Sequence, residues 1–489
     1  MRRRYLHWPH WLPAIAALVT FALIVIRAIY TVDPYWDTLA YHWPFAARLG
    51  GLCDRDCYSL SYPLEQRYNG FPLLLHAAQG LLWRATGTPG AADLINIAMV
   101  VVLAAYLKYR FAVPLAWSWL AFLAIPEVQI ELTATLIDLP LNAAVTVALM
   151  VVLRILVQPD QDQRPDVAIA LGMLAIAAGS KYQMFPIALA TWLAIVVLVA
   201  RKPSMIGLRR GTTAFLALGL AGAVVLLPKL VINLLAFGNP FYPIEADFGP
   251  VHFPGVESMI ASNSISDAWA STPRPLRWLA SVLEFDAFHG RPLPWTVGQG
   301  DVPQSSPSFR MGGYFVTYVL AAVGLLSWSA LSSARGKWPA ALLIVLTLLC
   351  ASLPNSHELR YYMFWMLTLV SSVLVAAYSP AFVNPQQALL RNLARGLVAI
   401  ACVSVVMMTG GEYLWPGGPT LSDLVKNTDA TVALVPEGGT LCILNRHRYG
   451  FLYASVFHPS RHYYTRSLWT DEPADCTLRI DLERNTADR

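Results

Sequence analysis

Charged residues are scarce in this sequence. Asp, Glu, Lys and Arg make up 13% of its 489 residues, whereas an average soluble protein has about 25%. The deficit excludes an ordinary soluble enzyme of three domains. A hydrophobic share of 56% also excludes a disordered chain, because disorder requires low hydrophobicity and high charge. No nucleic-acid motif accompanies the net charge of +5, and we find no internal repeat and no low-complexity segment.

Long apolar runs fill much of the chain instead. The mean hydropathy is +0.49, and a membrane-spanning helix needs about 20 apolar residues. The first run is too long for the core of a signal peptide and no small-residue cleavage site follows it, so we expect it to be retained. The sequence therefore predicts an all-α polytopic membrane protein with about eleven transmembrane helices. These are expected at residues 12–31, 92–107, 111–129, 136–157, 167–180, 184–200, 212–236, 312–331, 339–353, 361–378 and 396–410.

Basic residues in the short connections predict the orientation. The chain begins with three arginines after Met1, which favours a cytoplasmic N-terminus. If the chain crosses the membrane once at each predicted helix, all the remaining short basic clusters also fall on the cytoplasmic side. These clusters are Lys108/Arg110, Arg164, Arg201/Lys202/Arg209/Arg210, Arg335/Lys337 and Arg391/Arg395. We therefore predict a multi-pass membrane protein whose N-terminus is cytoplasmic and whose C-terminus lies on the opposite, periplasmic side.

Three longer segments fall on the predicted periplasmic side. They are a first loop at 33–91, a second loop at 238–310 and a tail at 411–489. We divide the chain into a transmembrane domain, residues 1–410, and a small C-terminal domain, the tail. Within the first loop, the apolar run 68–84 predicts a helix that lies on the membrane surface.

The tail has a mixed pattern. Strand-like runs at Thr440–Leu444 and Cys476–Ile480 flank a helical run at Gly450–Phe457, which predicts a small α/β domain. Two cysteine pairs fall in the periplasmic segments. They are Cys53 with Cys57 and Cys442 with Cys476. Two disulfides and four free thiols both fit an external location, whereas a zinc site is disfavoured because no second ligand pair lies near the first.

The ionisable residues of the apolar region gather at the predicted external ends of the helices. A transporter is expected to place coupling residues near the midplane, so this distribution favours a site at the membrane–water boundary. The residues concerned are Asp33, Asp37, Glu127, Glu131, Asp138, Lys181, Lys229, His357, Glu358 and Arg360.

The segment after the first helix contains a candidate base. Asp37, Tyr41 and Arg48 are spaced to share one helix face, with Asp37 near the helix N-terminus. The helix dipole favours an ionised carboxylate there, which can accept a proton from an alcohol. The alternative is a first-turn or capping carboxylate without a chemical role.

The same segment resembles a known family. Residues Trp36–Arg48, WDTLAYHWPFAAR, are similar to the first-loop motif of bacterial GT-C membrane glycosyltransferases, in the branch of protein O-mannosyltransferases and lipid A aminoarabinose transferases. Further motifs follow in the order of that family over residues 10–380. They are Tyr68–Pro72, Ile137–Pro140, Gly179–Tyr182, Phe237–Pro243 and Glu358–Tyr362. The tail lies outside the resemblance.

The resemblance implies a GT-C fold, a location in the bacterial inner membrane and a sugar donor linked to a polyprenyl phosphate. The acceptor is then a cell-envelope glycan, lipid or protein, and no nucleic acid partner is expected. Asp37 matches the first-loop aspartate, which acts as general base in an inverting transfer. Asp138 matches a second acidic residue that supports the first or binds a divalent cation, although N-capping of its helix is an alternative.

Other residues are expected to bind the substrates. Lys181, Arg360 and the adjacent Tyr361 are candidates for the donor phosphate, whereas snorkelling to the headgroups explains Arg27 and Lys229. The remaining candidates for substrate contact are Tyr41, His42, Glu131, His357 and Glu358. Tyr41 either stacks on a sugar or anchors the chain in the interface, and the two histidines are either hydrogen-bonded or metal ligands. No cofactor is certain.

Two other functions remain open. A polymerase or ligase of polyprenyl-linked glycans works at the same face, and a lipid or polyol transporter has a similar composition. A non-catalytic assembly subunit is a third alternative, against which the intact Asp37 argues.

Overall fold

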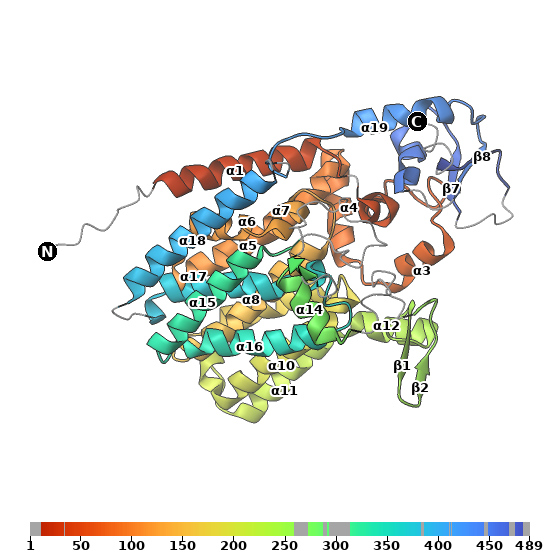
Figure 1. Cartoon of the computed structure of the whole chain (residues 1–489). Coiled ribbons are helices and arrows are strands. Elements are labelled where there is room, and N and C mark those ends of the chain that lie inside the picture. Colours follow the sequence, from red (N-terminus) through yellow and green to blue (C-terminus); the bar gives the residue numbers. More distant parts are fainter. Residues whose placement is uncertain are drawn as a thin grey trace.

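The computed structural model describes most of the chain. The described residues are 11–33, 35–258, 272–286, 291–292, 313–382, 386–409, 411, 413–444, 448–468 and 475–482. They form an elongated bundle of helices, and the first loop and the tail both lie at one end of it (Figure 1). Within the predicted second loop, residues 238–310, the segments 259–271, 287–290 and 293–310 lie outside the described residues.

Each predicted apolar run overlaps a helix. The bundle helices are α1 (Trp11–Tyr30), α5 (Leu94–Phe111), α6 (Leu115–Leu123), α7 (Pro126–Leu132), α8 (Asp138–Val157), α9 (Arg164–Ala178), α10 (Phe185–Arg201), α11 (Gly211–Leu226), α12 (Pro228–Phe237), α15 (Val316–Ser332), α16 (Lys337–Ser352), α17 (Phe364–Tyr378) and α18 (Gln387–Met408). Five described helices are long and apolar enough to cross a membrane, or seven if each of two bent pairs is one span, and three more are shorter and apolar. The protein is a multi-pass, mostly helical membrane protein, while the count of eleven spans stays a prediction.

Two predicted spans are not straight. The run 111–129 is split into α6 and α7, which meet at 98°, and the run 212–236 is split into α11 and α12, which meet at 52°. Pro126 and Pro228 stand at the first turn of the second helix in each pair. Proline lacks the N–H that would continue the preceding helix and clashes with its last turn. The bends therefore have a local cause.

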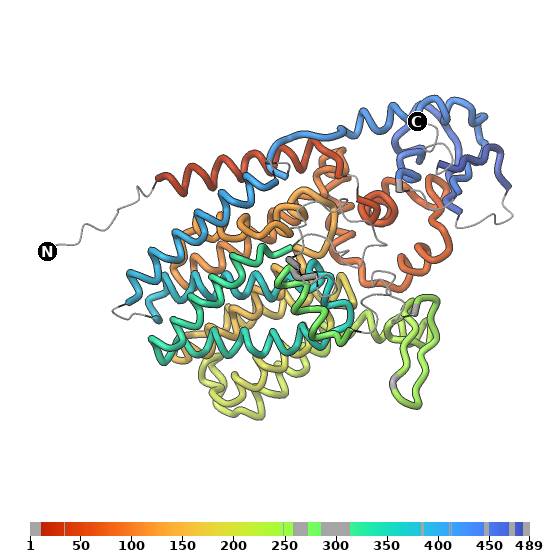
Figure 2. Tube along the Cα trace, in the orientation of Figure 1, coloured from red at the N-terminus to blue at the C-terminus, as the bar shows by residue number. Residues whose placement is uncertain are grey.

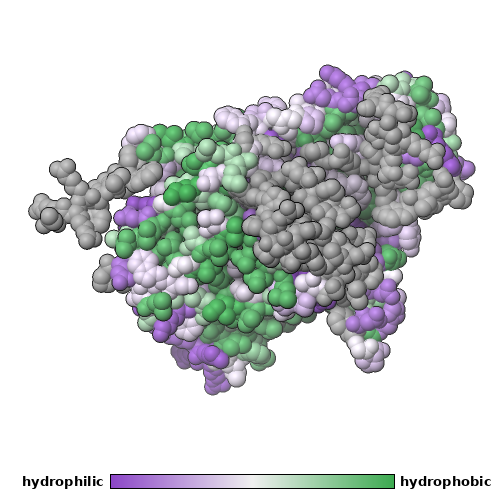
Figure 3. Space-filling view, in the orientation of Figure 1, coloured by the Kyte–Doolittle hydropathy of each residue, from purple (hydrophilic) through white to green (hydrophobic). Residues whose placement is uncertain are grey.

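Burial separates the centre of the bundle from its rim. Every residue of α8 except Leu156 is buried, whereas α1 buries only Ile24 and Ala28. Large apolar side chains such as Leu216 and Met407 face outward, and apolar residues gather over the outer helices (Figure 3). Such a surface suits a lipid solvent, in which the backbone polar groups of each helix are satisfied internally.

The first loop folds into short helices that pack on one another. They are the π-helix η1 (Thr38–His42), α2 (Trp43–Leu49), α3 (Tyr62–Gly70), α4 (Leu74–Thr86) and the 3-10 helix η2 (Pro89–Asp93). The predicted single surface helix at 68–84 is wrong, because α3 ends at Gly70 and α4 begins at Leu74. Helix α4 packs on α2 so closely that a Cβ on Gly80 would lie 2.1 Å from the carbonyl oxygen of Ala46.

The described part of the second loop forms small sheets. Its elements are β1 (Ile244–Phe248), β2 (Val251–Phe253), β3 (Glu257–Ser258), α14 (Arg274–Val282), β4 (Phe285–Asp286) and β5 (Arg291–Pro292). Strand β1 pairs antiparallel with β2 and parallel with β3, and β4 pairs antiparallel with β5. The guanidinium of Arg67 in α3 binds both carboxylate oxygens of Glu257, at 2.5 and 3.0 Å. This bidentate pair fixes the second loop to the first.

The tail combines helices with a parallel sheet. It contains α19 (Leu421–Val432), β6 (Thr440–Ile443), the 3-10 helices η7 (Arg448–Tyr453) and η8 (Ser455–Phe457), β7 (Tyr464–Ser467) and β8 (Leu478–Ile480). The strand order is β7-β6-β8, and the disulfide Cys442–Cys476 joins β6 to the residues before β8. The α/β character was predicted, but the run 450–457 is 3-10 helix. Helix α19 was missed although Thr420 and Asp423 form a capping box at its start.

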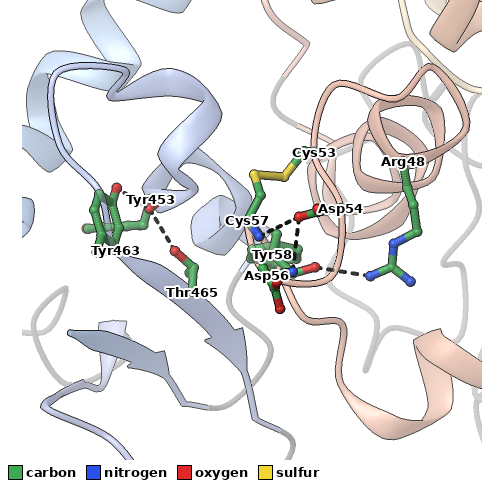
Figure 4. Close-up of a disulfide and its surroundings, with 9 residues drawn as sticks. All are labelled: Arg48, Cys53, Asp54, Asp56, Cys57, Tyr58, Tyr453, Tyr463 and Thr465. Atoms are coloured by element: carbon green, nitrogen blue, oxygen red, sulfur yellow. Dashed lines mark hydrogen bonds between the residues drawn. A yellow bond between two sulfur atoms is a disulfide. The ribbon is translucent and has the colours of Figure 1, made fainter. Parts of the chain in front are cut away.

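The tail packs directly on the first loop, as the trace in Figure 2 shows. Phe457 of the tail lies 6.4 Å from the ring of Trp43 and 6.1 Å from that of Trp83, both in the first loop. The first loop has its own disulfide, Cys53–Cys57, and Figure 4 shows it facing the tail. The domain boundary at 410 stays a prediction.

Candidate functional site

Two ion pairs lie at the end of the bundle that carries the first loop. Asp37, at the start of η1, accepts a hydrogen bond at Oδ2 from Nη1 of Arg360 at 2.8 Å. Arg360 belongs to the 3-10 helix η5 (Leu359–Tyr362). Nζ of Lys181, which follows α9, lies 2.5 Å from Oδ1 of Asp138 at the start of α8. The structure thus brings together four predicted site residues from distant parts of the chain.

The aromatic ring of Tyr361 connects the two pairs. Lys181 Nζ lies 4.4 Å from the ring centroid, and the Arg360 guanidinium carbon lies 4.8 Å from it. Nη2 of Arg360 also donates to the Tyr361 hydroxyl at 3.0 Å. The side chains remain partly open, with 21% of Asp37, 18% of Lys181 and 11% of Arg360 exposed. Each ion pair therefore has at least one partly exposed member.

Neither aspartate caps its helix. Asp37 occupies the N-cap position of η1 and Asp138 is the first residue of α8, but no side-chain capping hydrogen bond forms at either start. Their described partners are the cations of other segments. The capping alternative is therefore wrong for Asp138, whereas for Asp37 only the capping hydrogen bond is absent and the alternative of a first-turn carboxylate without a chemical role stays open.

Asn142 holds η5 against α8. Its side-chain amide donates to the carbonyl oxygens of Asp138 and Arg360 at 2.8 and 2.9 Å, and its Oδ1 accepts from the backbone N–H of Phe364 at 2.8 Å. The hydroxyl of Tyr314 adds a bond of 2.7 Å to the carbonyl of Leu359. Because the amide is fully buried and satisfied at both ends, it fixes the backbone that carries both ion pairs.

Glu131 lies at the same junction. It is fully buried in α7, and its Oε2 accepts from the backbone N–H of Leu139 at 2.5 Å. The amide of Asn96 donates to the backbone carbonyl of Glu131 at 2.7 Å. The observed contacts of Glu131 therefore order the turn before α8, and a contact with substrate stays a prediction.

Two histidines of the first loop contact each other. Nδ1 of His42 lies 2.7 Å from Nε2 of His76, and the two rings stack at 4.9 Å. Burial lowers the pKa of His42 well below its usual value and lowers that of His76 to about 3, so both rings are neutral at pH 7 and one donates to the other. Sequence reasoning missed His76, although a polar residue inside the apolar run of α4 was the available signal.

The remaining candidates surround this centre. The ring of Tyr41 lies 4.3 Å from that of His42 and 6.0 Å from the guanidinium carbon of Arg67. His357 and Glu358 are buried directly before η5. Arg48 binds Glu65 at 2.8 Å and the carbonyl of Tyr58 at 3.0 Å. Because η1 winds as a π-helix, with more residues per turn than an α-helix, the common face of Asp37, Tyr41 and Arg48 stays a prediction.

Asp33 fixes the start of the first loop. It accepts from the hydroxyl of Thr38 and from the backbone N–H groups of Thr135 and Tyr35, at 3.0, 3.0 and 3.1 Å. Burial is the main cause that raises the pKa of Asp33 to about 6. The hydroxyl of Thr135 donates to Asp93 at 2.7 Å, so one threonine joins two acidic side chains. The sequence did not predict this network.

Two residues expected to snorkel have other partners. Nη1 of Arg27 donates to the carbonyls of Trp415 and Gly417 at 2.6 and 3.2 Å, which ties α1 to the segment before the tail. Lys229 donates to the carbonyl of Asn69 at 3.0 Å. These contacts give both side chains a protein partner, and snorkelling to the headgroups stays a prediction for both. The described residues include no group of three or more His, Cys, Asp and Glu side chains placed to hold a metal ion.

Comparison with known proteins identifies the fold. Neither family models nor curated proteins match the sequence. Among solved structures, ArnT from Cupriavidus metallidurans in the apo state matches with a TM-score of 0.52 at 13% identity, over 93% of this chain and 88% of that one. The chain has the fold of ArnT. The same ArnT bound to undecaprenyl phosphate matches with a TM-score of 0.50 at 12% identity, over 93% and 89% of the two chains. The predicted GT-C type fold is thereby confirmed.

Proposed function

We propose that the protein is a membrane glycosyltransferase. It transfers a sugar from a polyprenyl-phosphate donor to a cell-envelope glycan, lipid or protein on the periplasmic side. The observation that carries the proposal is the paired arrangement Asp37–Arg360 and Asp138–Lys181 around Tyr361, in a chain with the ArnT fold. A structure of ArnT bound to undecaprenyl phosphate is among the matches, which supports a lipid phosphate as the leaving group.

In the proposed reaction the acidic and the basic side chains have separate roles. A hydroxyl oxygen of the acceptor attacks the anomeric carbon while the bond from that carbon to the phosphate oxygen breaks. The polyprenyl phosphate leaves as an anion, and the configuration at the anomeric carbon inverts. Asp37 takes the hydroxyl proton as general base. Arg360 and Lys181 stabilise the charge that develops on the phosphate.

Donor binding also prepares the base. In the described structure Arg360 binds Oδ2 of Asp37, and a donor phosphate competes for the same guanidinium N–H groups. When the phosphate takes that position, Asp37 loses its ion-pair partner and its carboxylate becomes available to the acceptor hydroxyl. Lys181 moves between Asp138 and the phosphate in the same manner. The base is thus released where donor is present.

The transporter is the weaker alternative. The assigned cations and carboxylates lie at helix starts and in short turns at the end of the bundle, away from the middle of the apolar helices, where transporters bind substrate. No step of the proposed transfer needs a divalent cation, since Arg360 and Lys181 supply the positive charge.

The test is transfer of radiolabelled sugar from a panel of polyprenyl-phosphate sugars to an envelope extract, with purified protein. Replacement of Asp37 by Asn keeps the shape and removes the base, so we expect Asp37→Asn to lower the transfer rate by about 10²-fold or more. Asp162→Asn is the matched control, because Asp162 is exposed and pairs only locally with Arg164 among the described residues.

Each outcome decides between the alternatives. Transfer by the control and its loss in Asp37→Asn support the assigned base. Equal rates in both variants would remove Asp37 from the mechanism and leave the transferase in place. Absence of transfer from every donor, with protein-dependent movement of labelled lipid across vesicles, would replace the enzyme by a transporter.

A further inference from the structure

A cavity of about 670 Å³ lies between the first loop and the tail, apart from the two ion pairs. The first loop lines it with residues of the disulfide turn and of the start of α3. The tail lines it with β7 and the turn before β6. The lining residues are Arg55, Asp56, Ser59, Leu60, Ser61, Tyr62, Gly438, Thr440, Tyr464, Thr465, Arg466, Ser467 and Leu468. Its volume is in the range of small-molecule sites, about 300–1,000 Å³.

Backbone hydrogen bonds join the two sides of the cavity. The backbone N–H of Ser59 donates to the carbonyl of Thr465 at 2.8 Å, and the N–H of Ser467 donates to the carbonyl of Ser59 at 2.9 Å. Ser59 thus extends the parallel sheet of the tail beyond β7. Oδ1 of Asp54 accepts from the backbone of Asp56 and Cys57 at 3.1 and 3.0 Å, which shapes the disulfide turn on the other side (Figure 4).

The chemistry of the walls is that of a saccharide site. Tyr464 and Arg466 alternate with buried residues along β7, so both side chains stand on its exposed face. Tyr62, which is 58% exposed, presents a second aromatic ring from the first loop. Exposed aromatic rings offer faces for the C–H groups of sugars, and arginines bind carboxylates in bidentate geometry.

The charged and hydrogen-bonding groups of the lining further restrict the class of ligand. Of the two lining arginines, Arg55 pairs with Glu65 at 2.5 Å. Arg466 has no ion-pair partner among the described residues, so it is the lining cation that is available to a ligand carboxylate. The hydroxyl of Ser61 is buried and has no hydrogen-bond partner among the described residues. A buried polar atom normally has a partner, so this hydroxyl marks a position that a ligand can satisfy directly or through water.

We infer that this cavity binds the acidic saccharide portion of the acceptor. The inference rests on the proposed function for the role of that saccharide. Because the cavity lies between two separate segments, the tail contributes to the choice of acceptor while the donor centre carries out the transfer. The ligand is an oligosaccharide with at least one carboxylate, held by Arg466 and stacked on Tyr464.

Calorimetric titration of the purified full chain tests the inference without any sugar donor. The probes are trigalacturonic acid and, as the neutral match, maltotriose. We expect the acidic trisaccharide to bind at least tenfold more tightly than the neutral one. The variant with Arg466→Ala and Tyr464→Ala weakens this binding at least tenfold, whereas Arg466→Lys keeps part of it.

Two controls separate the cavity from other sources of binding. Lys426→Ala removes one positive charge from exposed α19 outside the lining and leaves the affinity within twofold. Arg360→Gln alters the donor centre and also leaves it within twofold. The thermal unfolding midpoint of each variant shows that the tail is still folded.

The inference fails if the wild type does not bind the acidic probe saturably, if it binds both probes equally, or if the double variant binds as the wild type does. Loss of binding in Arg360→Gln would place the saccharide in the donor centre and overturn the inference as well. Since the titration contains no donor, failed sugar transfer with intact binding overturns only the proposed function. Intact transfer with no probe binding overturns only the cavity.

Discussion

The two ends of the helix bundle use the same residue types for different purposes. At the end with the basic connections, Asp166 of α9 is fully buried and binds Arg154 and Arg110 at 2.7 and 2.9 Å, with a third bond of 3.0 Å from the hydroxyl of Tyr106. At the other end, Asp37 and Asp138 each bind one described cation, at 2.8 and 2.5 Å. A carboxylate with three partners holds helices together, whereas a carboxylate with one partner can exchange that partner for a ligand.

The largest effect is expected from a substitution of Asp166, the carboxylate with three partners. Asp166→Asn leaves two arginines near one another without their shared anion, and removal of one partner from a buried ion pair costs about 3–5 kcal/mol. We expect a clear fall in the thermal unfolding midpoint in detergent, with the transfer rate per folded molecule unchanged. A variant that stays as stable as the wild type but loses transfer would show that this end also belongs to the site.

The second effect concerns pH. Because burial raises the pKa of Asp33 from 3.8 to about 6, the folded protein binds more protons than the unfolded chain between about pH 4 and pH 6. Stability from this group therefore falls as pH rises through that window, by at most about 3 kcal/mol. Below and above the window the contribution is constant.

The measurement for Asp33 is the thermal midpoint of wild type and Asp33→Asn from pH 4 to pH 7. The difference between the two curves removes the titration of all other groups, and it should change in favour of the variant as pH rises. A difference that stays constant across the window would show that Asp33 has an ordinary pKa and that its hydrogen bonds offset its burial.

The smallest effect is expected from a substitution of Lys181, at the end of the bundle where each aspartate has one described cation. Lys181→Gln keeps a donor toward Asp138 but removes the charge, so we expect the KM for the lipid donor to rise about tenfold, with a smaller change in kcat. Lys202→Gln is the matched control, because Lys202 forms an exposed pair with Asp160 at 2.5 Å near the other end. Equal KM values for both variants would show that Lys181 does not bind the donor and that its pair with Asp138 is structural, as the pairs of Asp166 are.

The helices were predictable because each depends on a local run of apolar residues. The bends were not predicted, although Pro126 and Pro228 carried the signal. At the site, the sequence singled out Asp37, Lys181 and Arg360 by their position at helix ends. It could not predict which charges pair, because Asp37 and Arg360 are separated by 323 residues and no periodicity reports contacts over that distance.

The same reasoning explains what was missed. Asn142 and Thr135 carry no charge and lie in apolar surroundings, so nothing in their local sequence marks them as junctions between segments. His76 and Asp33 were visible as polar residues at apolar helices, but their partners His42 and Thr135 come from other segments. The roles of these residues depend on hydrogen bonds between segments that are distant in the sequence, which a local sequence pattern does not reveal.

The contact between the tail and the first loop has a consequence for biosynthesis. Trp43 and Trp83 precede nearly all the helices of the bundle in the chain, and the rings that cover them, Phe451 and Phe457, follow the last one. During translation the first loop is therefore made long before the rings that cover its tryptophans. The packing of this end of the molecule can be completed only after the last helix of the bundle has been synthesised.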